Sequence, residues 1–193
     1  MQKIIEDVLY SVLSSLYQPF WLALVLAFCA LVISDEVSKV GAKHFIKIWK
    51  DRFTKKDNRY KFYFWFYASM ILYRTVLNRT FWKSPLSDVI GVWGLYNSKG
   101  EFTTEIIENL LLFVPFSFLF MKAYYKKRNE KVYYGKMFFL ISKLSFFTSF
   151  GIEMMQLIFR VGTWQLSDLF FNTIGGMIGA IGYLLLQTIK YRK

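Results

Sequence analysis

Two long apolar runs, residues 137–159 and 168–186, follow one another near the C-terminus and are separated by only eight residues. Each run carries polar side chains near one end, namely Glu153 and Gln156 in the first run and Asp168 and Asn172 in the second. Residues three or four positions apart lie on one face of an α-helix. Because the connection is short, the two helices are expected to be antiparallel neighbours with both polar faces at the same end. An ionisable side chain in a membrane-length segment is costly and by default marks a functional site.

The composition is that of a small membrane protein. Of the 193 residues, 55% are hydrophobic and 21% are aromatic. The formal net charge of +12 is concentrated in particular loops between apolar runs, which is the positive-inside pattern of membrane proteins and not that of a nucleic-acid-binding surface. A single cysteine, Cys29, and a single histidine, His44, exclude a disulfide framework and a Cys/His zinc site. We therefore expect no cofactor, no metal and no nucleic-acid partner.

We expect an all-α membrane protein with five transmembrane helices, at residues 17–34, 60–77, 109–125, 137–159 and 168–186. Pro115 lies in the middle of the third run, where a kink is expected. The loops at 35–59 and 122–136 and the C-terminal tail hold seventeen Lys and Arg residues, whereas the N-terminus and the other two loops hold five. Because basic loops stay in the cytoplasm, this split predicts an N-terminus outside and a C-terminus inside.

The first 59 residues are expected to differ from the remainder. Apolar residues at helical spacing in residues 4–16 predict an amphipathic lead-in to the first span. Residues 35–59 place aromatic and aliphatic side chains on one face and lysines on the rest, which predicts a cytoplasmic amphipathic helix on the membrane surface; a solvated charged loop is the alternative. We thus expect residues 1–59 to form an N-terminal helix, the first span and this basic segment, and residues 60–193 to form a four-helix membrane domain.

The expected topology brings the polar ends of four helices to the same level on the outer side of the membrane. The residues that would meet there are Arg74, Arg79, Glu105, Glu108, Asn109, Glu153, Gln156, Arg160, Asp168 and Asn172. Because four separate helix ends bring polar residues to one depth of the membrane, we predict a functional site there. Glycines at positions 175 and 179, and the small residues at 176 and 180, predict close packing of the last helix against its neighbours.

Four segments carry a family resemblance: LYRT at 72–75, ENLLLFVPFSF at 108–118, IEMMQ at 152–156 and GTWQLSDLFFNTIGGMIG at 162–179. On these segments, which extend over about residues 60–182, the chain resembles the VanZ-like family of small bacterial membrane proteins. It departs from the family pattern at Gln165 and Ser167, where acidic residues are common, and at Ser117, where glycine is common. The resemblance implies a multi-pass protein of the bacterial cell membrane with a role at the Gram-positive envelope and, for the family's namesake, low-level resistance to teicoplanin.

Three interpretations of the polar cluster remain open. In the structural one, the carboxylates pair with arginines, and the amides of Asn and Gln link helices at about 0.6–2 kcal/mol each. In the second, the cluster binds or modifies an outer-leaflet amphiphile: membrane phospholipid, a lipid-linked cell-wall precursor or a lipoglycopeptide. In the third, the charges couple proton movement to transport or flipping, although five helices without an internal repeat argue against a secondary transporter.

We favour the second interpretation and assign roles within it. Glu153 and Asp168 are the acid/base or electrostatic centre, because neighbouring carboxyl groups in different environments acquire separate pKa values. The anion partners are Arg74, Arg79 and Arg160, since guanidinium groups bind phosphate and carboxylate in bidentate fashion. The orienting residues are Asn109, Gln156 and Asn172. Whether a reaction is catalysed and whether the protein forms oligomers stay open.

Overall fold

The computed structural model describes residues 6, 10, 19–34, 56–97, 100–125 and 134–191. Over those residues the chain is all-helical, and the all-α prediction is confirmed there. The helices are α2 (Phe20–Ser34), α4 (Lys56–Leu72), α5 (Glu105–Tyr124), α6 (Tyr134–Phe159) and α7 (Leu166–Tyr191), and α4 continues directly into a π-helical turn, η2 (Tyr73–Leu77). The amphipathic lead-in predicted at 4–16 and the surface helix predicted at 35–59 lie almost entirely outside the described residues.

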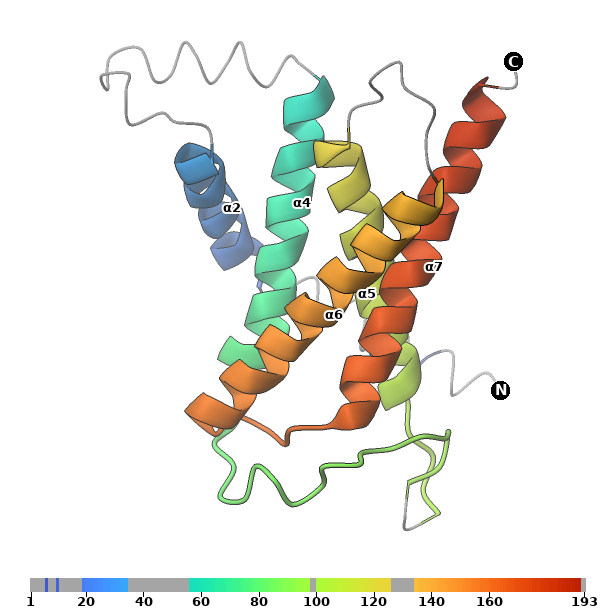
Figure 1. Cartoon of the computed structure of the whole chain (residues 1–193). Coiled ribbons are helices and arrows are strands. Elements are labelled where there is room, and N and C mark those ends of the chain that lie inside the picture. Colours follow the sequence, from blue (N-terminus) through green and yellow to red (C-terminus); the bar gives the residue numbers. More distant parts are fainter. Residues whose placement is uncertain are drawn as a thin grey trace.

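Helices α4, α5, α6 and α7 form a bundle, and α2 lies at its edge beside α4 (Figure 1). Helix α6 crosses the bundle obliquely, as Figure 1 shows. The end of η2, the start of α5, the end of α6 and the start of α7 all lie at one end of the bundle, where the loop between η2 and α5 runs across the helix ends. We call this end the polar end, because it carries the acidic and amide residues that the sequence singles out.

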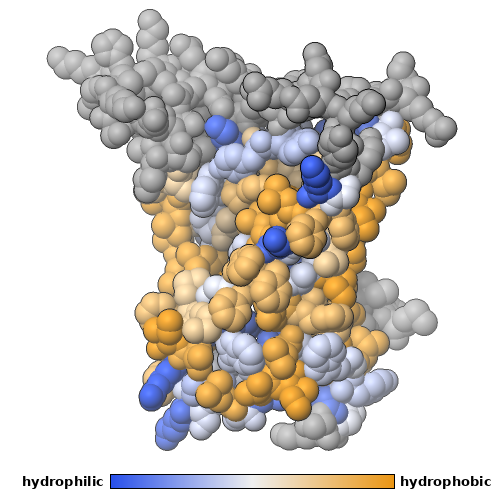
Figure 2. Space-filling model, in the orientation of Figure 1, coloured by the Kyte–Doolittle hydropathy of each residue, from blue (hydrophilic) through white to orange (hydrophobic). Residues whose placement is uncertain are grey.

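Three helices are long and apolar enough to cross a bilayer, at Glu105–Tyr124, Gly135–Phe159 and Leu166–Ile189. Twenty residues of α-helix span about 30 Å, the thickness of the hydrocarbon layer. The other two are shorter, with 15 residues in α2 and 17 in α4. A broad hydrophobic band surrounds the middle of the molecule, with hydrophilic residues towards its ends (Figure 2). These are the properties of a membrane protein, whereas five spans and the orientation of the termini stay predictions.

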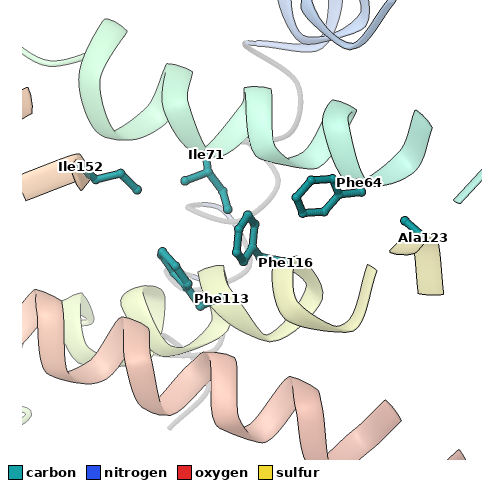
Figure 3. Close-up of a cluster of buried hydrophobic side chains, with 6 residues drawn as sticks. All are labelled: Phe64, Ile71, Phe113, Phe116, Ala123 and Ile152. Atoms are coloured by element: carbon teal, nitrogen blue, oxygen red, sulfur yellow. The ribbon is translucent and has the colours of Figure 1, made fainter. Parts of the chain in front are cut away.

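A cluster of buried hydrophobic side chains joins α4 to α5 and α6. Its members are Phe64 and Ile71 from α4, Phe113, Phe116 and Ala123 from α5, and Ile152 from α6 (Figure 3). The rings of Phe113 and Phe116 lie 5.3 Å apart, and that of Phe64 lies 5.3 Å from Phe116. Lipid tails are as apolar as these side chains, so close van der Waals packing holds the helices together. Helix α5 continues through Pro115 to the far end of the cluster.

Glycines bring α7 into close contact with α5 and α6. A Cβ atom at Gly175 would lie 2.1 Å from the carbonyl oxygen of Leu110, and one at Gly179 would lie 2.2 Å from that of Val114. On the neighbouring face, a Cβ atom at Gly176 would lie 2.0 Å from a hydroxyl oxygen of α6. The close packing predicted from the glycine spacing is therefore confirmed. It places the first turn of α5 beside the first turns of α7.

Candidate functional site

The loop between η2 and α5 is bonded to the α6–α7 connection over most of that connection's length. Four backbone N–H groups link the two segments: Trp82 donates to Arg160, Trp164 to Pro85, Leu166 to Val89 and Ser167 to Ile90, at 2.7, 2.8, 2.9 and 3.3 Å. The first N–H groups of a helix have no carbonyl partner within that helix. Since two of these donors belong to the first turn of α7, the loop supplies the N-terminal partners that α7 lacks.

Asp88 holds the middle of this loop in place. One carboxylate oxygen accepts a hydrogen bond from Gln165 Nε2 at 3.1 Å, and the other accepts one from the backbone N–H of Gly91 at 3.2 Å. Gly91 has φ +72°, and a Cβ atom there would lie 2.0 Å from Ser167 Oγ. Only glycine meets both the backbone conformation and the close approach at this position.

Glu153 and Asp168 both lie at the N-terminus of α7. Glu153, which is 1% exposed, accepts a hydrogen bond at 2.9 Å from the backbone N–H of Gln165, the residue that precedes α7. Asp168, in the first turn of α7, accepts one at 2.7 Å from Asn109 Nδ2 on α5. The N-terminus of a helix favours negative charge because its dipole and its free N–H groups point there. Three helices thus hold two carboxyl groups at one helix end.

Arg79 is an arginine that lies near this carboxylate cluster. Its side chain is exposed and lies within electrostatic range of Glu105, Glu153 and Asp168. In the part of the chain that the structure describes, however, neither Glu153 nor Asp168 has a cationic nitrogen within 4 Å, and Arg79 forms no ion pair. Gly162, with φ +99°, lies beside it, and the Arg79 guanidinium is 3.7 Å from the place of a Cβ atom there. The guanidinium therefore lies near three acidic residues, and among the described residues no carboxylate forms an ion pair with it.

The other two predicted arginines lie elsewhere. Arg74, in η2, forms an ion pair with Glu108 in the first turn of α5, and Glu108 also accepts a hydrogen bond of 2.6 Å from the Thr104 hydroxyl. Arg160 is exposed and adopts φ +53° at the turn that ends α6. No hydrogen bond or ion pair joins the Arg160 side chain to the carboxylates in the described residues. The structure thus brings Arg79, and not Arg160, close to Glu153 and Asp168.

Gln156 and Asn172 link helices next to the carboxylates. Gln156 Nε2 donates to the carbonyl oxygen of Thr75 at 2.7 Å, and this carbonyl belongs to the last turn of η2, where helical carbonyls lack partners. Asn172 Nδ2 donates to Ser149 Oγ at 2.9 Å, whereas its buried Oδ1 has no hydrogen-bond partner among the residues that the structure describes. These amides fix α6 against η2 and α7, and so fix the position of Glu153.

Several residues of this end were not assigned a role from the sequence, namely Thr75, Asp88, Thr104, Ser149 and Gln165. One signal for Ser149 was present, because buried polar residues recur along α6 at helical spacing: Ser142, Ser145, Ser149, Glu153 and Gln156. The contact of Asp88 with Gln165 joins two irregular segments 77 residues apart. No periodic pattern predicts such a contact.

A sequence profile of the family described as VanZ/LLP1 matches residues 20–187. The chain belongs to this family. The match covers α2 and the whole polar end, including every residue of the cluster, and it confirms the resemblance found in the sequence. Together with the three long apolar helices, it makes the chain a VanZ-like membrane protein. A search of the curated proteins found no match, and neither did a search of the solved structures.

Proposed function

We propose that this VanZ/LLP1-family protein binds an amphiphile of the outer leaflet through an anionic group at Arg79, beside a carboxyl pair formed by Glu153 and Asp168. The observation that carries the proposal is the exposed Arg79 guanidinium, which lies within electrostatic range of both carboxyl groups yet has no ion pair in the described residues. A cation held only to neutralise the two acids would be expected to contact one of them.

The chemistry of the cluster formed by Arg79, Glu153 and Asp168 fits an amphiphile with a phosphate or carboxylate head. A guanidinium binds either group through two parallel hydrogen bonds. Two ionised carboxylates would repel such a head group, so anion binding at Arg79 requires that Glu153 or Asp168 carry a proton. A protonated carboxyl group beside an ionised one is also what general acid/base catalysis needs. Binding and modification of the ligand therefore both require one protonated and one ionised carboxyl group beside Arg79.

Three kinds of amphiphile have this chemistry: a phospholipid, a lipid-linked cell-wall precursor and a lipoglycopeptide. Binding or modification of any of them at the envelope of a Gram-positive cell would alter access of a glycopeptide to its target. The proposed phenotype is accordingly low-level resistance to teicoplanin, which the family resemblance also implies. The residues proposed to act are Glu153, Asp168 and Arg79, positioned by Asn109, Gln156 and Asn172.

A second candidate function is that of a non-enzymatic membrane scaffold. It is favoured by the helix-linking contacts Arg74–Glu108, Gln156–Thr75 and Asn172–Ser149, which need no ligand. Glu153 and Asp168 also join elements, through the Gln165 N–H and Asn109 Nδ2. The scaffold interpretation therefore accounts for the carboxyl pair as well, but it leaves Arg79, which has no ion pair among the described residues, without a role.

The test compares teicoplanin susceptibility and lipid composition, by mass spectrometry, in a susceptible Gram-positive host with and without the protein. We expect the wild-type protein to raise the inhibitory concentration, Arg79→Gln to abolish the increase, and the matched variant Arg160→Gln to retain it. A gained or lost lipid species would identify an enzyme, whereas resistance with unchanged lipids would identify binding. No change in susceptibility or lipids on adding the wild-type protein, or equal loss in both variants, would reject the proposal.

A further inference from the structure

The loop between η2 and α5, which we call the polar-end loop (residues 78–104), exposes many large apolar side chains. Among its described residues, those exposed by more than two-fifths include Phe81, Leu86, Ile90, Trp93, Leu95 and Tyr96. Ile90 is the most exposed of them, at 68%. We call these side chains the apolar patch; exposed apolar side chains that gather on one segment mark a site of interaction with a partner or a membrane.

These side chains cannot turn inward, because the backbone that carries them is fixed. The carbonyl oxygen of Ile90 accepts hydrogen bonds from the backbone N–H of Ser167 at 3.3 Å and from Trp93 Nε1 at 2.9 Å. Asp88, two residues before Ile90, accepts hydrogen bonds from Gln165 Nε2 and from the backbone N–H of Gly91, the residue after Ile90. The exposed apolar side chains therefore belong to a loop whose backbone is held in place by hydrogen bonds.

The apolar patch is continuous with the apolar surface of α7. The Trp93 ring lies 5.2 Å from that of Phe170 and 5.8 Å from that of Phe171, and Phe170 is itself 47% exposed on a helix long enough to span a bilayer. At the same end of the bundle, Ile158 and Phe159 of α6 are also at least 60% exposed. The exposed apolar surface of α7 therefore extends over the loop through Trp93.

The composition of the loop fits the interfacial layer of a membrane. Trp and Tyr concentrate at the level of the lipid head groups, where the ring is apolar and its N–H or O–H group meets polar partners. The sequence of the loop holds three basic residues, Arg79, Lys83 and Lys99, and two acidic ones, Asp88 and Glu101. Because the net charge is only +1, apolar and aromatic contact is the main attraction to the bilayer.

We propose that the polar-end loop lies within the head-group layer of the phospholipid bilayer, with Ile90 and Trp93 inserted among the lipids. The loop is then a membrane-contacting element. The cluster of Arg79, Glu153 and Asp168, which the loop adjoins, then lies at the level of the lipid head groups. This placement does not depend on which ligand, if any, the cluster binds.

The test uses spin labels on the full-length protein with Cys29 replaced by serine, at one copy per nanodisc of phosphatidylcholine and phosphatidylglycerol. A label at Ile90→Cys is compared with a matched label at Lys83→Cys, an exposed charged position of the same loop. We expect the Ile90 label to be accessible to oxygen and several-fold less accessible than the Lys83 label to a water-soluble nickel chelate.

Equal accessibility of both labels to the nickel chelate would place the loop in water and overturn the proposal. Low accessibility of the Ile90 label to oxygen and to nickel alike would mean that protein covers it, which would overturn it too. The Arg79→Gln variant with the Ile90 label is expected to give the wild-type pattern, so failure of ligand binding at Arg79 is distinguished from failure of membrane contact.

Discussion

Replacing Gly175 with alanine should push α5 and α7 apart. The added methyl carbon would lie 2.1 Å from the carbonyl oxygen of Leu110, whereas Cβ atoms essentially never approach closer than 3.0 Å. The two helix backbones therefore have to separate by about 1 Å at this point to restore van der Waals contact. Overpacking of this kind costs about 1–3 kcal/mol, and the higher helix propensity of alanine offsets up to about 1 kcal/mol of it.

With the middle of the overpacking range, about 2 kcal/mol, and the full offset, the net loss is about 1 kcal/mol, which should lower the unfolding temperature by about 2–4 °C in a chain of this size. The assay is thermal unfolding of the purified full-length protein in detergent. The matched control is Gly182→Ala, on the same helix, where a Cβ atom would have no neighbour within 4 Å. The control should melt at or above the wild-type temperature. If Gly175→Ala melts as high as Gly182→Ala, the close packing of α5 on α7 is wrong.

Three further predictions follow from the polar end. Gln156→Leu removes the donor to the buried Thr75 carbonyl, so thermal unfolding in detergent should show a loss of about 1–3 kcal/mol; an unchanged unfolding temperature would refute the contact. Gly91→Ala places a Cβ atom 2.0 Å from Ser167 Oγ and should detach the polar-end loop, seen as faster proteolysis within it. On the predicted topology, a cysteine at Lys83 of the polar-end loop should react with an impermeant reagent added outside cells, and one in the α5–α6 loop should not; the reverse pattern would put the polar end in the cytoplasm.

Much of the helical architecture could be predicted from hydropathy alone. The apolar runs at 137–159 and 168–186 correspond to α6 and α7, and the short connection makes them antiparallel. The predicted starts were two to four residues late for α4, α5, α6 and α7, because polar residues of the first helical turns lie outside an apolar run although their backbone is helical. The first helix, in contrast, starts at Phe20 instead of residue 17.

The contacts within the polar end could be predicted less well. The convergence of the acidic and amide residues follows from topology, since four helix ends must meet at one side. Which arginine lies near which carboxylate depends on the path of the irregular loops: Arg160 is adjacent in sequence to α6, yet Arg79 is the arginine near Glu153. The hydrogen bonds of the polar-end loop to the α6–α7 connection likewise have no periodic signal in the sequence.

If Glu153 acts on a ligand and does not hold the fold together, Glu153→Gln should remove function and leave stability intact. Glutamine keeps the size of the side chain and an oxygen that can accept the Gln165 N–H, and no cation within 4 Å among the described residues would be left unpaired. The measurement is the unfolding temperature in detergent, together with teicoplanin susceptibility of cells that make the same variant. Glutamine mimics the neutral carboxyl group that anion binding requires, but it cannot exchange a proton with the ligand. We therefore expect an unfolding temperature within about 4 °C of wild type, the shift expected for 1 kcal/mol, and complete loss of resistance. Resistance that persists in the stable variant, or stability and resistance that fall together, would contradict it.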